Sequence, residues 1–166
     1  MDFFRLYDLP PTLQPDKAAV KKRYLELSRQ HHPDRAANGS AEAQIEALQT
    51  TAAINEGFRT LSNPDRTLAY VLKGHGILED EEKYTLPPSF LMEMMELNEA
   101  VDAGADATQA VQPFLEDWEA AYTPLVKRYE AGDRSEALLM ALKDAYFRKK
   151  YLLRIAGRLD TFDPSR

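Results

Sequence analysis

The sequence predicts an all-α protein made of two helical domains. Apolar residues recur at helical spacing along most of the chain, and no alternation of apolar and polar residues is long enough to predict a β-strand. The charge balance also changes along the chain. Residues 1–74 carry 10 basic and 9 acidic side chains, whereas residues 75–166 carry 11 and 18. We therefore expect an N-terminal domain over 1–74, a linker over 75–88 and a C-terminal domain over 89–166.

The first elements expected are a short helix and a longer amphipathic one. Residues 2–8 form a short helix or turn that Pro10 and Pro11 stop. The next helix runs from about Asp16, a plausible N-cap, to His31. One stripe of this helix holds Val20, Tyr24, Leu27 and His31.

The tripeptide His32-Pro33-Asp34 separates this helix from the next. Pro33 disfavours helical geometry at His32, and the segment 38–40 (Asn-Gly-Ser) supplies turn chemistry before a new helical pattern begins. A polar turn is thus expected at the tip of a helical hairpin. On these residues alone, Asp34 could simply cap the following turn while His32 closes the core.

The third helix, about residues 40–61, is expected to be the central element of the N-terminal domain. Its apolar residues form two rows, so both faces should pack on neighbours: Ile45, Leu48 and Ala52 in one row, Ile54, Phe58 and Leu61 in the other. A fourth helix begins where Asn63 can cap and Pro64 suits the first helical position, and it ends by Gly74.

The acidic segment 75–88 has no clear period and ends in two prolines, which is typical of a linker. Three more helices follow, at about 89–103, 106–131 and 133–160. Glycines lie between them, and Pro124 should kink or divide the second. Long helices joined by short turns predict an antiparallel three-helix bundle.

Composition narrows the possible functions. The 166 residues are 44% hydrophobic and 29% charged, as in a soluble globular protein, and no apolar run approaches the ~20 residues of a membrane span. Met1 leads almost directly into the first helical turn, so we expect no targeting peptide and a cytoplasmic, most simply bacterial, setting. Without cysteine the chain offers no thiolate ligand, and we expect no cofactor or bound metal. The net charge of -6 argues against nucleic acid as a partner.

The N-terminal 74 residues resemble the J domain. The resemblance lies in the order and spacing of these segments: Asp2–Tyr7, Arg29–His32, the His-Pro-Asp loop, Ile54–Phe58 and Asn63–Tyr70. J domains are DnaJ-type modules that stimulate ATP hydrolysis by DnaK-class chaperones. The resemblance implies that His32, Pro33 and Asp34 contact such a chaperone.

The order of J domain, acidic linker and three-helix domain resembles the HscB family, the co-chaperones of bacterial iron–sulfur cluster assembly. Residues 90–97 (Phe-Leu-Met-Glu-Met-Met-Glu-Leu) resemble that family closely. The resemblance implies two partners. The J domain would engage HscA, a specialised DnaK-class ATPase, and the C-terminal bundle would bring it the scaffold protein IscU.

The helix that begins near residue 89 separates a core stripe from an outer surface. At ~100° per residue, Phe90, Met94, Leu97 and Val101 fall within one narrow arc. Leu91 and Met95 lie to one side, and Met92 points nearly opposite the stripe. Flexible apolar side chains rimmed by carboxylates suit an adaptable protein-binding patch. The resemblance assigns scaffold binding to Leu91, Met92, Met95, Glu96, Glu99 and Phe147.

A simpler interpretation of this patch stays open, in which Leu91 and Met95 pack against the last bundle helix or the J domain. Ala103 also departs from the family, where a longer polar residue is common, so the edge of the surface is not fixed.

The chaperone-binding surface can be reasoned from side-chain chemistry. Asp34 offers a carboxylate that can accept a bidentate arginine pair, and Pro33 fixes the backbone beside His32. Three basic residues lie on an arc away from the core stripe of their helix, where they either meet an acidic chaperone surface or are merely solvated: Lys21, Lys22 and Arg29. Leu25 and Glu26 interrupt this basic run, which suggests a narrower choice of partner than in other J domains.

Other functional classes fit less well. His31, His32 and Asp34, with His75, could be imagined as a hydrolytic or metal cluster, but neighbouring histidines at a helix end point to different sides. The chain has no phosphate-cradling glycine loop and no nucleophile motif, so we expect no enzyme. The main alternative is a general J-domain co-chaperone whose C-terminal bundle binds a different client.

Overall fold

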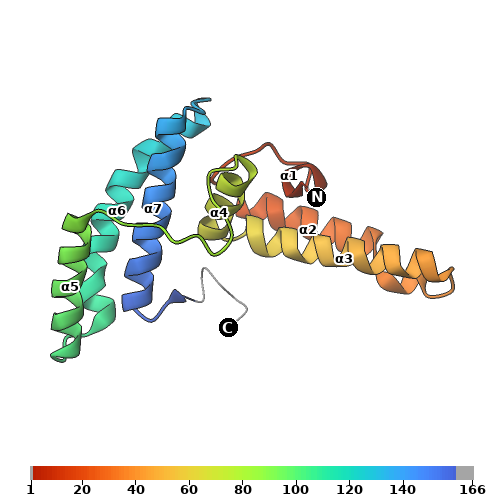
Figure 1. Ribbon diagram of the computed structural model, residues 1–166. Helices are drawn as coiled ribbons and strands as arrows, with labels where there is room; N and C mark the ends of the chain where they lie inside the picture. The colour runs from red at the N-terminus through yellow and green to blue at the C-terminus, as the bar shows by residue number, and fades with distance from the viewer. Residues whose placement is uncertain (1, 160–166) are drawn as a thin grey trace. The chain divides into compact units, whose positions relative to one another are not determined.

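The structure, a computed structural model, describes residues 2–159. Every regular element within these residues is a helix, which confirms the predicted fold class (Figure 1). The chain divides into two compact units, and the division falls between Thr67 and Leu68. None of the helices in the described part is long and apolar enough to cross a membrane.

The first unit is built on a hairpin of two helices, α2 (Lys17–Gln30) and α3 (Ala41–Leu61), which run antiparallel in contact with each other (Figure 1). The short α1 (Phe3–Leu6) packs on α3. Asp16 caps α2 as predicted, since its carboxylate accepts a hydrogen bond from the Ala19 N–H at 2.7 Å. The structure adds a cap at Ser40, whose hydroxyl accepts from the Ala43 N–H at the start of α3.

The inner side of the hairpin forms a continuous core. Tyr24 on α2 stacks on Phe58 of α3 with ring centroids 4.4 Å apart. Gly57 provides room for α1, because a β-carbon at this position would lie only 2.6 Å from Cε2 of Tyr7. Burial raises the pKa of Tyr7, whose hydroxyl donates to the Ile54 carbonyl.

The prediction that α3 packs on both faces is wrong. Ile45 and Leu48 are 55% and 61% exposed, whereas Ile54 and Leu61 are each only 2% exposed. At ~100° per residue, Ile45 lies roughly 180° from Ile54 around the helix. Because α1, α2 and the short turn before α3 all cover the Ile54 side, the first apolar row faces solvent.

Helix α4 (Pro64–Gly74) begins as predicted and spans the division between the units. Asn63 caps it, since its side-chain oxygen accepts from the N–H groups of Asp65 at 2.9 Å and Arg66 at 3.1 Å. Pro64 occupies the first helical position, where a missing N–H costs no hydrogen bond.

The second unit contains the three predicted helices, α5 (Pro88–Asp102), α6 (Ala107–Glu130) and α7 (Glu136–Ile155) (Figure 1). Gly104 and Gly132 end the first two with φ angles of 108° and 100°, a region that favours glycine. Helix α7 ends earlier than expected, because Gly157 adopts a φ of 68° just beyond it. The predicted end at Asp160 lies outside the described residues.

Helix α6 is not divided by its prolines and continues through both Pro113 and Pro124. Both rings are exposed, so the carbonyl that each leaves without its helical partner lies at a surface open to water. The Thr123 hydroxyl also donates to the Glu119 carbonyl at 2.9 Å, adding a hydrogen bond in the turn that reaches Pro124.

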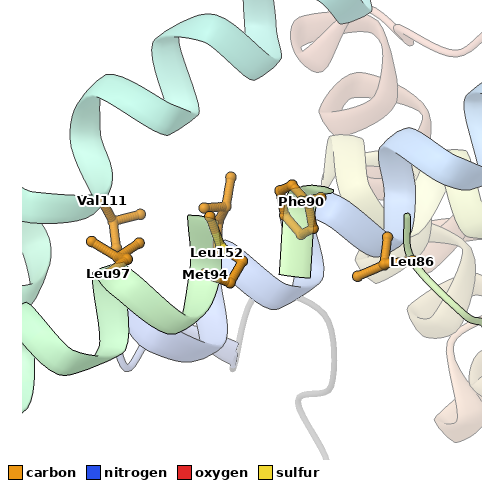
Figure 2. Close-up of a cluster of buried hydrophobic side chains, with 6 residues drawn as sticks. All are labelled: Leu86, Phe90, Met94, Leu97, Val111 and Leu152. Atoms are coloured by element: carbon orange, nitrogen blue, oxygen red, sulfur yellow. The ribbon is translucent and has the colours of Figure 1, made fainter. Parts of the chain in front are cut away.

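The core of the second unit confirms the predicted stripe on α5. Figure 2 shows Phe90, Met94 and Leu97 in a row along this helix, meeting Val111 of α6 and Leu152 of α7. Met94 has no exposed surface. Val101 is only half-buried and ends the stripe. The remaining member of the cluster is Leu86, which comes from the segment before α5.

The segment before α5 is irregular in structure but packs along α7; we call residues 77–86 the strap. Leu78 and Leu86 of the strap are buried. The ammonium group of Lys143 on α7 donates to the Ile77 carbonyl at 2.9 Å and to Glu82 Oε1 at 2.7 Å. Much of the predicted linker is thus held against the bundle.

Candidate functional site

The His32-Pro33-Asp34 loop has a defined backbone. His32 is extended, with φ -63° and ψ 131°, as expected for a residue before proline. Pro33 begins a 3₁₀ turn, η1 (Pro33–Ala36), and the His32 side chain caps it by accepting the Asp34 N–H on Nδ1 at 3.3 Å. Histidine thus holds the turn, and the aspartate carboxylate is left outside it.

Helix α3 anchors both ends of the loop. The Thr51 hydroxyl shares its one proton between the Ala47 carbonyl of its own helix at 2.8 Å and the His31 carbonyl at 3.2 Å, where α2 ends. The Gln44 amide donates to the carbonyls of Ala37 at 3.3 Å and Gly39 at 3.1 Å, where the loop returns to α3. These contacts tie the backbone at both ends of the loop to a regular helix.

The carboxylate and imidazole of the loop both reach solvent. The Asp34 side chain is 89% exposed and that of His32 is 57% exposed, with 3.5 Å between His32 Nδ1 and Asp34 Oδ2. His32 therefore does not close the core, and the cap of the turn is His32 rather than Asp34. An exposed carboxylate on a fixed backbone can accept hydrogen bonds from a partner's arginine.

The predicted basic residues of α2 share an exposed face. Lys21, Lys22 and Arg29 are exposed, and Leu25 lies among them with 44% of its surface exposed. Arg23 belongs to a different side, because its Nε donates to the Tyr7 carbonyl at 3.0 Å. The exposed face is therefore basic with an apolar centre.

The α5 patch is divided between exposed and half-buried residues. Met92 and Met95 are 64% and 62% exposed, and Glu96 and Glu99 beside them are also exposed. The simpler interpretation, in which Met95 is packed away, is wrong. Leu91 is half-buried and packs on the hydrophobic core cluster of the second unit.

Phe147, the predicted contribution of α7, stands beside the strap. Its ring stacks on Tyr84 with centroids 4.7 Å apart and planes 9° apart. The Tyr84 hydroxyl donates to Asp144 Oδ1 at 2.9 Å, and burial together with this bond raises the pKa of Tyr84 to about 12. Leu91 and Phe147, distant in sequence, line one groove with the strap.

Sequence reasoning missed Tyr84 and Lys143. Tyr84 lies in an irregular segment and Lys143 in a helix about sixty positions later, so no pattern of apolar spacing indicates that the two segments are in contact. The available signal was local: Tyr84 and Leu86 are isolated apolar residues in an otherwise acidic stretch. Across residues 2–159, no group of three or more histidine or acidic side chains is placed to hold a metal ion.

Comparisons with known proteins agree with this architecture. Residues 86–160 match the family described as the HSCB C-terminal oligomerisation domain. The fold is similar to that of the chaperone HscB from Vibrio cholerae, with a TM-score of 0.73 and 24% identity over 99% of both chains. It is also similar to human co-chaperone protein HscB, with a TM-score of 0.75 and 24% identity over 100% of this chain and 84% of the human one. Residues 86–160 thus match the C-terminal domain of the HSCB family, and the chain as a whole shares the fold of the two HscB structures.

Proposed function

We propose that this protein stimulates the ATPase of HscA, a specialised DnaK-class chaperone, and delivers the iron–sulfur scaffold protein IscU to it. The observation that carries the proposal is the presence of two unlike exposed surfaces on separate units of one chain. One is the anchored loop with the Asp34 carboxylate, and the other is the patch around Met92 and Met95. In a bacterial cell both partners would be met in the cytoplasm.

The loop acts without chemistry of its own. A ligand shifts the conformational equilibrium of a partner only if it binds one conformation more tightly. The contacts from Gln44 and the cap from His32 hold the loop backbone on either side of Asp34, so little backbone ordering is needed when a chaperone arginine binds its carboxylate. The basic face of α2 then adds attraction to an acidic surface and speeds the encounter.

The ATPase of HscA, measured with and without this protein, tests the chaperone half of the proposal. Asp34→Asn and His32→Gln should abolish stimulation while helicity and melting temperature stay nearly unchanged, because both side chains are largely exposed. Asp102→Asn, at an exposed position on α5, is the matched control and should stimulate as the wild type does. Full stimulation by Asp34→Asn would refute this role of the loop.

Calorimetric titration of the full-length protein with IscU tests the client half. Alanine at Leu91, Met92 and Met95 together should weaken binding by at least about tenfold, since a few central apolar residues dominate most interfaces. Met140→Ala is the matched control, because Met140 is a 40% exposed methionine on α7 outside the patch. If the wild type fails to bind IscU, a general J-domain co-chaperone with another client becomes the better description.

A further inference from the structure

A groove of about 480 Å³ runs between the strap, the start of α5 and the second half of α7. Its apolar lining comes from all three segments: Tyr84, Leu86, Leu91, Phe147 and Tyr151. Two of these residues, Leu91 and Phe147, belong to the proposed client-binding patch. The groove therefore continues that patch around the side of the bundle.

The charges that line this groove are mainly positive. Lys83 comes from the strap, and Lys150 and Arg154 come from successive turns of α7. Among the described residues that line the groove, Glu82 is the one acidic side chain, and its Oε1 is held by Lys143 at 2.7 Å. The groove thus carries an excess of positive charge, in contrast to the carboxylates on the outer side of α5.

The groove is already formed in the unbound protein. Tyr84 stacks on Phe147 and its hydroxyl is held by Asp144, so the strap wall is fixed relative to α7. Lys143 fixes the strap again at Ile77 and Glu82. A site that needs no rearrangement binds an extended segment with a smaller entropic cost.

We infer that this groove binds a segment of the client in which a carboxylate lies beside an apolar side chain. This inference rests on the proposed function, because the groove adjoins the client-binding patch. Lys150 and Arg154 would pair with the carboxylate while the apolar side chain packs on Phe147 and Leu91. With Glu96 on the opposite side of the patch, the charges also fix which way round the client docks.

A second groove in the same unit does not fit this role. It has a volume of about 350 Å³ and is bordered by Glu93, Asp117 and Asp144. Arg148 is the one cationic side chain among the described residues that line this second groove, and its Nε donates to Asp144 Oδ2 at 2.5 Å. Neither Leu91 nor Phe147 lines it, so it does not extend the patch.

Charge reversal tests the inference in the full-length protein with IscU as the probe. Lys150→Glu and Arg154→Glu should each weaken binding by about three- to tenfold, as expected when a rim attraction becomes a repulsion. The salt dependence of the affinity between about 0.05 and 0.3 M should become shallower than in the wild type. Lys127→Glu makes the same charge change at an exposed site on α6 and should bind IscU as the wild type does.

The outcomes separate the inference from the proposed function. If the wild type binds IscU and both reversals bind as tightly as Lys127→Glu, the inference is wrong and the proposed function stands. If the wild type does not bind IscU at all, the proposed function fails first and the inference falls with it. Lys150→Gln removes the charge without reversing it, so its loss of affinity for IscU should lie between those of the wild type and Lys150→Glu. Such a graded loss would show that the charge, and not misfolding of the variant, is the cause.

Discussion

Replacing Lys143 with methionine should remove one of the attachments between the strap and α7 and leave Glu82 unpaired. The residue is 8% exposed, and its ammonium group bonds both the Ile77 carbonyl and Glu82. The pair is largely enclosed, with the side chains of Lys143 and Glu82 10% and 18% exposed. Oε2 of Glu82 is buried and has no hydrogen-bond partner among residues 2–159. Without Lys143, the whole carboxylate would be left without a donor.

The size of the effect follows from this enclosure. Removing one member of a buried ion pair costs about 3–5 kcal/mol when the remaining charge cannot escape. Glu82 lies on an irregular segment and retains 18% of its side-chain exposure, so its carboxylate can turn toward water. We therefore expect Lys143→Met to lower the free energy of unfolding of the second unit by about 2–3 kcal/mol, below the fully buried range.

Tryptophan fluorescence during urea unfolding measures this loss in the intact chain. Trp118 is the single tryptophan, and its Nε1 donates to the Ala145 carbonyl at 2.8 Å, so its signal reports on the packing of α6 against α7. The double variant Lys143→Met with Glu82→Leu should recover to within about 1 kcal/mol of the wild type, because no unpaired charge remains. Lys73→Met is the control, since it breaks an exposed pair, and it should leave the transition nearly unchanged.

Two results would refute this reasoning. A loss below about 0.5 kcal/mol for Lys143→Met would mean that the ion pair does not hold the strap, since surface substitutions have effects of that size. A double variant as unstable as the single one would mean that the unpaired Glu82 carboxylate is not the cause.

Three further predictions concern packing and charge. Gly57→Ala should lower the free energy of unfolding of the first unit by about 1–3 kcal/mol, because the new β-carbon would lie 2.6 Å from the Tyr7 ring. Thermal unfolding followed by circular dichroism measures this loss, and an unchanged melting curve would contradict the prediction. Met94→Ala should destabilise the second unit by about 2–5 kcal/mol, because Met94 is fully buried. Met92→Ala should change the stability of that unit by less than about 0.5 kcal/mol, because Met92 is exposed. Equal losses for the two variants in urea unfolding would contradict this difference in burial. Asp133 has its pKa lowered to about 2, chiefly by the backbone N–H of Ser135, so its contribution to stability is present above pH 3.8 and is lost as the pH falls toward 2. The stability difference between the wild type and Asp133→Asn should therefore vanish over that range, and a constant difference would count against the assignment.

The helices and their starts could be predicted because their signals are local. Asp16, Ser40 and Asn63 each cap a helix through contacts two or three residues away, and such contacts are encoded in adjacent sequence. Apolar spacing was sufficient to identify the stripe of α5, since a single helix turns its residues by a fixed angle. The same argument separated Met92 from Met94.

What the sequence did not predict depends on contacts between distant segments. Tyr84 hydrogen-bonds Asp144, and Glu82 hydrogen-bonds Lys143, across about sixty residues of sequence. Because the strap is irregular, its apolar residues have no spacing from which these partners could be predicted. The prediction that the Ile45 row of α3 is buried was wrong for a related reason. Periodicity shows that Ile45 lies on a face, but only the position of neighbouring helices decides whether that face is covered.

The two proposed surfaces are built differently, one on a hydrogen-bonded loop and the other on exposed methionines, and the tasks we propose for them account for the difference. A loop that must distinguish two conformations of a chaperone needs fixed geometry, because differential affinity is lost if the loop adapts to both. The contact of Gln44 with the loop provides that rigidity. A patch that delivers a client must also release it. Met92 and Met95 offer flexible, exposed apolar surface, which gives contact area without a single rigid fit. In the docking mode that we infer, the basic groove beside Phe147 supplies the orientation that flexible methionines cannot.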